Sequence, residues 1–526
     1  ICPVGALTSK PFRYSARTWE LSRRKSVSPH DSTGTNLIVQ VKSNTVMRVL
    51  PLENEAINEC WIADRDRFSY EALNTNERLT SPMIKQGGQW QTVDWQTALE
   101  YVANGLKLVK SDHGAAGIGT LASPHSTVEE LYLAGALMRG LGSDNIDYRL
   151  RNAEFAPAAS VRWLGTSIAS LSDLQRVLVV GSNLRKDHPL FAQRIRQAAR
   201  KGCAVNAIVS GTELSSADAW ALPVAHTLLA EPSAWFSQLS EVAAAIAAAN
   251  GAALPAGISQ TASAAAQAMA KSLLGGERKA VLLGNAAAHH AEAGSLLALA
   301  NWIATQTGAS VGYLTEAANT VGAQLAGARP QAGGLNAAQM LEGQLKAVFL
   351  LNNEPEFDSA AGARAAAGLS NTQMVVTLSP FKANMAFSDV LLPIAPFTET
   401  PGTFVNAEGR VQSFHAVVKP LGETRPAWKV LRVLGNMLGL PGFDFESSAE
   451  VLAQVFGPAV DGISQVPAGK LSNATTVQPL AAALPAGRPA VAAIYQLDSL
   501  VRRAPALQLT ADARQPAAFL EQEVSA

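Results

Sequence analysis

The sequence predicts an α/β fold with doubly wound parallel sheets, preceded by a small β-rich unit near the N-terminus. After Trp95, short and wholly apolar segments alternate with helical segments, a pattern typical of parallel strands covered on both faces. Before Trp95, apolar and polar residues alternate, which favours antiparallel strands. The two patterns together indicate one small β unit and one large α/β region.

The small unit follows a loop-rich stretch, residues 1–25. Residues Asn36–Pro51 alternate apolar and polar side chains around the turn signal Ser43-Asn44, which predicts a β-hairpin. Segment Trp61–Tyr70 is expected to close the unit. Segment Arg78–Gln91 is expected to be a connecting loop with one short turn.

The large region opens with a predicted helix over Gln96–Lys110. Three of its strands end in small or amide residues, at Gly181–Asn183, Gly284–Ala286 and Asn352–Glu356. Ligands of such sheets bind beyond the carboxyl ends of the strands, but strand-to-helix turns with N-caps explain these residues too, and fold physics favours the second interpretation. The expected strands are Gly117–Ala122, Arg176–Val180, Ala204–Ile208, Lys279–Leu283, Ala347–Leu351 and Met374–Leu378.

Composition narrows the class of protein. The 526 residues carry no net charge, which gives no reason to expect nucleic acid or an acidic membrane surface as a partner. Three cysteines argue against a disulfide framework and fit a reducing compartment. We find neither a signal peptide nor an apolar run long enough to span a bilayer. The opening residues, without methionine, are expected to be the interior of a longer polypeptide.

Two segments resemble a known family. The first, Cys2–Val27 (CPVGALTSKPFRYSARTWELSRRKSV), is similar to the end of the iron–sulfur region of the G-type, 75-kDa-like subunit of bacterial NADH:quinone oxidoreductase. The second, Phe387–Phe414 (FSDVLLPIAPFTETPGTFVNAEGRVQSF), resembles a signature of the molybdopterin-oxidoreductase superfamily, to which that subunit is related. Val177–Phe191 is also similar to the superfamily pattern. The resemblance implies a molybdopterin-oxidoreductase-like α/β fold.

The resemblance implies a role for Cys2. In the family, the cysteine of CPVGAL is the fourth ligand of a [4Fe–4S] cluster. A proline directly after a ligand is common in such sets, since it removes a backbone donor and fixes the turn. Cys2 is therefore the expected cofactor-binding and metal-binding residue. Its three partner ligands, a [2Fe–2S] cluster and a further [4Fe–4S] cluster are expected in N-terminal sequence that is missing here.

A further superfamily cluster is expected to be absent. Some members hold it on a CxxCxxxC…C pattern, which falls here on Ser28, Asp31, Thr35 and Ala63. Hydroxyls, a carboxylate and a methyl group cannot hold such a cluster.

Molybdenum, pterin and flavin chemistry are not expected in this chain either. Superfamily enzymes bind molybdenum or tungsten through Cys, selenocysteine or Ser, at a position that falls near Ala153, with Asn152 and Glu154 beside it. No thiol or hydroxyl is available there. The string Gly114–Gly119 enters a strand instead of opening a helix, so it fails the context of a dinucleotide motif. We therefore expect neither molybdopterin nor FMN.

The other metal-ligand types carry no predicted role. Cys203 precedes a buried strand and should act as a small hydrophobe, and Cys60 is assigned nothing. His289 and His290 are adjacent and should not converge on a metal.

The resemblance implies a subunit of proton-translocating NADH:quinone oxidoreductase that transfers electrons between flavin and quinone. It would have no complete active site of its own and no catalytic residues. The expected parts are 1–25, the end of an iron–sulfur domain; 26–77, a small β-rich domain without its cluster; 78–440, the molybdopterin-oxidoreductase-like α/β domain; and 441–526, a C-terminal segment.

The implied partners are other subunits of the peripheral arm, both flavoprotein and connecting iron–sulfur subunits, without nucleic acid or a membrane span. The implied location is the cytoplasmic face of the bacterial inner membrane. One alternative is an active molybdopterin enzyme such as a formate dehydrogenase. Another is an unrelated α/β binding protein that uses the turn at Asn352–Glu356.

Overall fold

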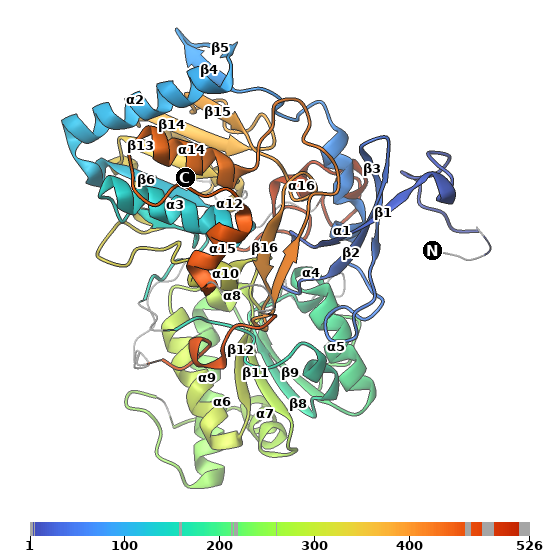
Figure 1. Ribbon diagram of the computed structural model, residues 1–526. Coiled ribbons are helices and arrows are strands. Elements are labelled where there is room, and N and C mark those ends of the chain that lie inside the picture. Colours follow the sequence, from blue (N-terminus) through green and yellow to red (C-terminus); the bar gives the residue numbers. More distant parts are fainter. Residues whose placement is uncertain are drawn as a thin grey trace.

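The structure, a computed structural model, describes residue 4 and residues 6–156, 160–211, 214, 219–258, 260–457, 464–475 and 489–514. Within these ranges the chain forms a small antiparallel sheet, two larger sheets and a two-stranded ribbon (Figure 1). Cys2 lies outside the described residues. No helix in the described ranges is long and apolar enough to cross a membrane.

The N-terminal unit is an antiparallel sheet of three strands, β1 (Ser22–Val27), β2 (Asn36–Lys42) and β3 (Thr45–Pro51). The predicted hairpin is confirmed. Its turn residues Ser43 and Asn44 have φ of 49° and 62°, as a tight two-residue hairpin loop requires. The helix α1 (Asp64–Phe68) and the 3-10 helix η2 (Ser69–Asn74) pack against β3.

The first large sheet has seven strands in the order β5-β4-β15-β14-β13-β6-β7. The strands from β15 to β7 are parallel to one another. They are β6 (Ile118–Ala122), β7 (Ile146–Asp147), β13 (Ala347–Leu351), β14 (Met374–Ser379) and β15 (Val390–Pro393).

The connecting loop expected over Arg78–Gln91 is wrong in its second half. There β4 (Met83–Gln86) and β5 (Gln89–Thr92) form a hairpin at the edge of this sheet. Gly87 and Gly88 turn it with positive φ, and β4 pairs antiparallel with β15. Two short, mostly polar strands carry too little apolar alternation to be recognised from sequence.

The second large sheet has five parallel strands in the order β10-β9-β8-β11-β12. The chain enters this sheet after β7 and returns to the first sheet at β13, so the second unit is inserted within the first. Its strands are β8 (Arg176–Val180), β9 (Ala204–Val209), β10 (His226–Leu229), β11 (Lys279–Leu283) and β12 (Ser310–Tyr313). All six strands predicted for the large region are thus confirmed.

Helices cover both faces of each large sheet, which confirms the doubly wound α/β fold. On the first sheet, α2, α3 and α14 pack on Phe349 and Val376, whereas α13 packs on Val348 and Val375 of the other face. On the second sheet, α6, α7 and α9 cover one face and α5 the other. These helices are α2 (Trp95–His113), α3 (Val128–Leu141), α5 (Pro189–Arg200), α6 (Trp235–Asn250), α7 (Ala264–Leu274), α9 (Ala293–Thr307), α13 (Arg364–Ser370) and α14 (Ala427–Met437).

A ribbon and the C-terminal residues connect the units. The ribbon strands β16 (Gly402–Val405) and β17 (Val411–Phe414) place Phe404 and Phe414 in the core that also holds Val39 of the N-terminal sheet. The short helix α16 (Ser499–Arg502) adds Leu500 to the same core. The next helix, α17 (Pro505–Gln508), packs against α1 and η2. Residues 489–514 therefore pack into the body of the molecule (Figure 1).

Candidate functional site

The loop between β1 and β2 carries residues that stand where cluster thiolates would be needed. Ser28, Asp31 and Thr35 are fully buried there, and the Ser28 N–H donates to the Thr35 carbonyl at 2.9 Å. Ala63 is buried at the N-terminal end of α1. The helix that it opens contributes Arg65, which contacts Asp31. The structure thus gathers the four expected positions around one buried polar network.

An ion pair stands at the centre of this network. The Arg65 Nη2 donates to Asp31 Oδ2 at 2.7 Å and to the Asp187 carbonyl at 2.7 Å. Both charged side chains are buried. Burial alone would raise the pKa of Asp31, but the Arg65 charge and the hydrogen bonds hold that pKa below its usual value.

His30 extends the network toward the C-terminal residues. Its Nδ1 lies 2.7 Å from Asp498 Oδ2 and its Nε2 lies 2.7 Å from Ser69 Oγ. Burial opposes protonation of His30, but the Asp498 carboxylate outweighs it, so the pKa of His30 is raised. Burial raises the pKa of the neighbouring Asp66 to about 6, although the charge of His30 opposes this.

A cavity of about 160 Å³ forms the second candidate site. It lies between the two large sheets, where ligands of open α/β sheets bind. Ser123 follows β6, Asn285 follows β11 and Thr315 follows β12, and all three line the cavity. The sequence places small or polar residues at these strand ends, and the two sheets turn them toward one space.

The segment around Ala153, where superfamily enzymes carry their molybdenum or tungsten ligand, also reaches this cavity. Asn152 and Glu154 line it. The Glu154 carboxylate accepts the Gly294 N–H of α9 at 2.7 Å, and burial raises the pKa of Glu154. The Ala153 N–H donates to the His289 carbonyl at 3.2 Å. The group nearest the expected ligand position is therefore engaged by a helix N-terminus.

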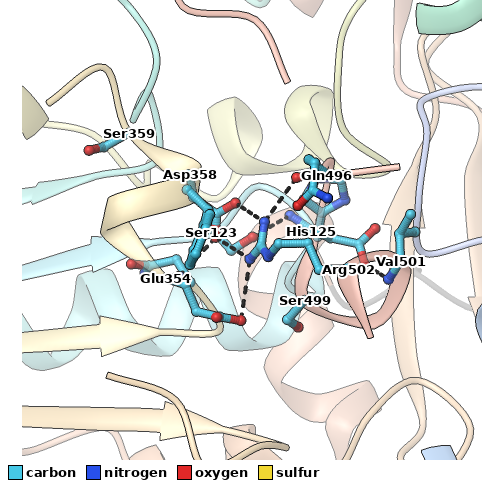
Figure 2. Close-up of polar contacts among 12 residues, drawn as sticks. Ser123, His125, Glu354, Asp358, Ser359, Gln496, Ser499, Val501 and Arg502 are labelled. Atoms are coloured by element: carbon cyan, nitrogen blue, oxygen red, sulfur yellow. Dashed lines mark hydrogen bonds and ion pairs between the residues drawn. The ribbon is translucent and has the colours of Figure 1, made fainter. Parts of the chain in front are cut away.

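Buried ion pairs close the cavity on the side of the C-terminal residues. Arg151 bonds Glu316 at 3.0 Å and Asp358 at 3.1 Å. Figure 2 shows Arg502 of α16 between Asp358 and Glu354, with distances of 2.8 Å to Asp358 and 3.3 Å to Glu354. The two acceptors belong to the segment after β13, so α16 is tied to the carboxyl end of an interior strand of the first large sheet.

The strand-end motifs serve mainly local structure. Asn183 accepts the Lys186 N–H as an N-cap, and Asn353 donates to the Leu121 carbonyl at 2.7 Å. Glu354 pairs with Arg503 at 2.6 Å as well as with Arg502. The interpretation as turns and caps is confirmed for Asn183, and Asn285 is the motif residue that reaches the cavity.

The remaining candidates lie apart from one another. Cys60 is exposed, whereas Cys203 is buried and its pKa is raised to about 11 by burial. His289 and His290 bond different carbonyls, those of Ala490 and Pro232. Within the described ranges, no group of three or more His, Cys, Asp or Glu side chains is arranged to hold a metal ion.

Sequence reasoning missed the charged partners Arg65, His30, Asp498 and Arg502. Asp498 and Arg502 belong to the string DSLVRR, a charged segment in a tail rich in Ala and Pro. That contrast is the signal that could have directed attention to them. Their contacts with residues more than a hundred positions away leave no local pattern.

Comparison with known proteins assigns the family. Residues 78–437 match the family model described as molybdopterin oxidoreductase, and the two doubly wound sheets agree with that match. The chain therefore belongs to the molybdopterin oxidoreductase family. Residues 21–71 match the model of the NADH-ubiquinone oxidoreductase NDSU1/NuoG-like 4Fe-4S domain, which points to one particular branch.

Similar curated proteins carry names of that branch. The G-type subunit of the NADH-quinone oxidoreductase of Rickettsia felis is 38% identical over 203 residues, which cover 38% of this chain and 30% of the relative. The NADH-ubiquinone oxidoreductase 75 kDa subunit of Reclinomonas americana is 27% identical and covers 85% of this chain. This chain in turn spans 62% of the latter protein.

A solved structure supports the fold alone. Acetylene hydratase from Pelobacter acetylenicus aligns with a TM-score of 0.60 at 13% sequence identity. The alignment covers 83% of this chain and 72% of that chain. The shared architecture gives no information about the chemistry of this chain, because fold similarity does not transfer function.

Proposed function

We propose that this chain is the scaffold and electron-transfer part of the G-type iron–sulfur subunit of NADH:quinone oxidoreductase, with a catalytically inert α/β domain. One observation carries the proposal. A buried Arg65–Asp31 ion pair stands where a family cluster would need thiolates. The matches of residues 21–71 and the names of the relatives support the same subunit.

The residues present do not fit the redox groups of the active family members. A cluster at Ser28, Asp31, Thr35 and Ala63 would lack all four thiolates. In the cavity, Glu154 already accepts the Gly294 N–H, and Ala153 has no metal-binding atom.

Electron transfer in the proposal rests on Cys2. Its thiolate would complete a [4Fe–4S] cluster between flavin and quinone, whose other ligands come from outside this chain. The same subunit would carry a [2Fe–2S] and a further [4Fe–4S] cluster there. The subunit would lie peripherally on the cytoplasmic face of the bacterial inner membrane, against flavoprotein and connecting iron–sulfur subunits of the proton-translocating complex.

The test replaces Cys2 in the intact complex. Because the following residues, Pro3 to Ala6, offer no ligand, Cys2→Ala is expected to lose one [4Fe–4S] EPR signal and NADH:quinone turnover. Reduction of ferricyanide by NADH, which draws electrons upstream, should persist in the assembled complex. Cys60→Ala, the matched control at an exposed cysteine, should retain every signal. A Cys2→Ala complex with all cluster signals and normal quinone reduction would refute the proposal.

A further inference from the structure

One arginine that lines the cavity between the large sheets forms no ion pair with the carboxylates that line the same cavity. Two of its three lining carboxylates, Glu316 and Asp358, bond the same arginine, Arg151. The third, Glu154, accepts a backbone N–H. The other arginines that line the cavity are Arg149, Arg162 and Arg329.

Of these, Arg149 is satisfied, because it bonds Asp147 through two nitrogens at 2.9 Å each. Arg162 is different. Its Nη1 donates to the carbonyl oxygens of Ser472 and Ala474 at 3.2 Å and 2.6 Å. Among the described residues, no carboxylate forms an ion pair with it. Within the described residues, its guanidinium is therefore balanced by carbonyl dipoles.

Gln324 fixes Arg162 at the cavity wall. Both contacts are with the backbone of Arg162. The Gln324 Oε1 accepts the backbone N–H of Arg162 at 2.8 Å, and the Gln324 Nε2 donates to the Arg162 carbonyl at 3.1 Å. Burial lowers the pKa of Arg162, and the nearby charge of Arg329 lowers it further, against the opposing effect of Tyr313. A cation held in this way gains from an anion placed beside it.

Two phenol hydroxyls lie beside this arginine. Tyr148 and Tyr313 both line the cavity, and burial raises the pKa of each to about 12. Both hydroxyls therefore carry their protons at neutral pH and can donate. In the part of the chain that the structure describes, neither makes a hydrogen bond, although a buried tyrosine hydroxyl normally has a partner.

We propose that Arg162, Tyr148 and Tyr313 form an oxyanion subsite that binds the phosphate or carboxylate group of a small hydroxylated molecule. Guanidinium and hydroxyl donors that line one cavity suit the oxygens of such a group. A protein cavity of roughly 150 Å³ accommodates a molecule the size of benzene, so a cavity of about 160 Å³ accepts more than an inorganic ion.

His289, another lining residue, supplies an acceptor for the rest of the ligand. His289 Nδ1 donates to the Ala490 carbonyl at 2.7 Å, and burial lowers the pKa of His289. The imidazole is thus neutral at pH 7, and its Nε2, which lies 3.8 Å from Glu316 Oε2, has a lone pair. Because His289 lines the same cavity, it suits a ligand hydroxyl. Sugar phosphates and hydroxy acids combine the two kinds of group.

The test is calorimetric titration of the purified full-length protein with three probes: ribose 5-phosphate, malate and inorganic phosphate. We expect one organic probe to bind at least about tenfold more tightly than inorganic phosphate, since it also reaches His289. Whether ribose 5-phosphate or malate binds identifies the oxyanion. Failure of both to bind at millimolar concentration would overturn the proposal.

Two variants localise the binding. Arg162→Gln should weaken it at least about tenfold, because a hydrogen bond to a charged group is lost. Tyr313→Phe should weaken the binding about three- to tenfold while leaving the packing of the ring unchanged. If Arg162→Gln fails to fold, the Tyr313 variant alone tests the subsite. Arg24→Gln, at an exposed site on β1, is the control. Unchanged affinity in the folded Arg162 and Tyr313 variants would contradict the subsite.

Discussion

Asp31 and Arg65 form a buried ion pair. Neither charge would be stable in this interior without the other. The attraction between buried charges roughly offsets their loss of hydration only while both are present. The network around them behaves in the same way, since His30 is held by Asp498 on one side and Ser69 on the other. The charged side chains at the positions that we expect to lack cluster thiolates therefore satisfy each other.

This dependence gives a double-mutant prediction. Arg65→Met leaves the Asp31 carboxylate buried and unpaired, which should cost about 3–5 kcal/mol in the free energy of unfolding. Arg65→Met combined with Asp31→Asn removes both charges and should recover most of that loss. Denaturant titration followed by tryptophan fluorescence measures both, with exposed Arg24→Met as control. Equal losses in the single and double variants would show that the charges do not act as a pair.

Asp66 predicts a pH dependence. Its folded-state pKa of about 6 lies above the ordinary value of 3.8, so the folded protein retains a proton that the unfolded chain releases. Stability is therefore lost as pH rises from about 3.8 through 6. Asp66→Asn should remove that loss and stabilise the protein at pH 7.5 by on the order of 2 kcal/mol.

The measurement compares the free energy of unfolding of wild type and Asp66→Asn between pH 5 and pH 8. The difference should grow toward pH 7 and then level off. Exposed Asp112→Asn is the matched control. A difference that does not change with pH would mean that Asp66 stays ionised in the folded protein.

At the scale of elements, the sequence predicts what depends on local pattern. The hairpin turned by Ser43 and Asn44 and the six apolar strands follow from periodicity and turn chemistry. The hairpin of β4 and β5 does not, because its strands are short and polar. The network around Arg65 and the packing of α16 depend on contacts between distant parts of the chain, which residue order alone does not show.

The attachment of α16 is itself testable. Arg502 donates to Asp358, to Glu354 and to the Gln496 carbonyl, so Arg502→Gln leaves two buried carboxylates with fewer partners. We expect residues 489–514 to detach more often and to be cleaved at least about fivefold faster in limited proteolysis. Exposed Arg364→Gln is the control. Identical cleavage rates would indicate that Leu500 and the apolar core hold the segment unaided.

At the scale of the whole molecule, the fold of the molybdopterin oxidoreductase family surrounds a cavity whose residues we expect not to bind molybdenum or tungsten. The first large sheet, the inserted second sheet and the cavity between them are all present. At the position of the family's metal ligand, Ala153 offers only a methyl group. The neighbouring Glu154 carboxylate accepts the Gly294 N–H of α9. We therefore expect that this chain keeps the architecture of the family without its molybdenum chemistry, as fold-level similarity permits.

Metal analysis of the purified full-length protein tests this separation. We expect iron in amounts that match the proposed clusters, without stoichiometric molybdenum or tungsten. No pterin should be released on denaturation. A fluorescent pterin oxidation product together with bound molybdenum would restore the alternative of an active molybdopterin enzyme such as a formate dehydrogenase.

Because the second sheet is inserted within the first, its strands are all synthesised before the first sheet is complete. Strand β6 ends at Ala122, but its neighbour β13 begins only at Ala347, and the whole five-stranded unit is made between them. At roughly 5–20 residues per second, the edge of β6 waits on the order of tens of seconds for its partner. The inserted unit has all its strands before then and can fold first. The nascent chain thus carries a complete inserted sheet while the first sheet is still incomplete. The unpaired edge of β6 needs shielding until β13 emerges from the ribosome.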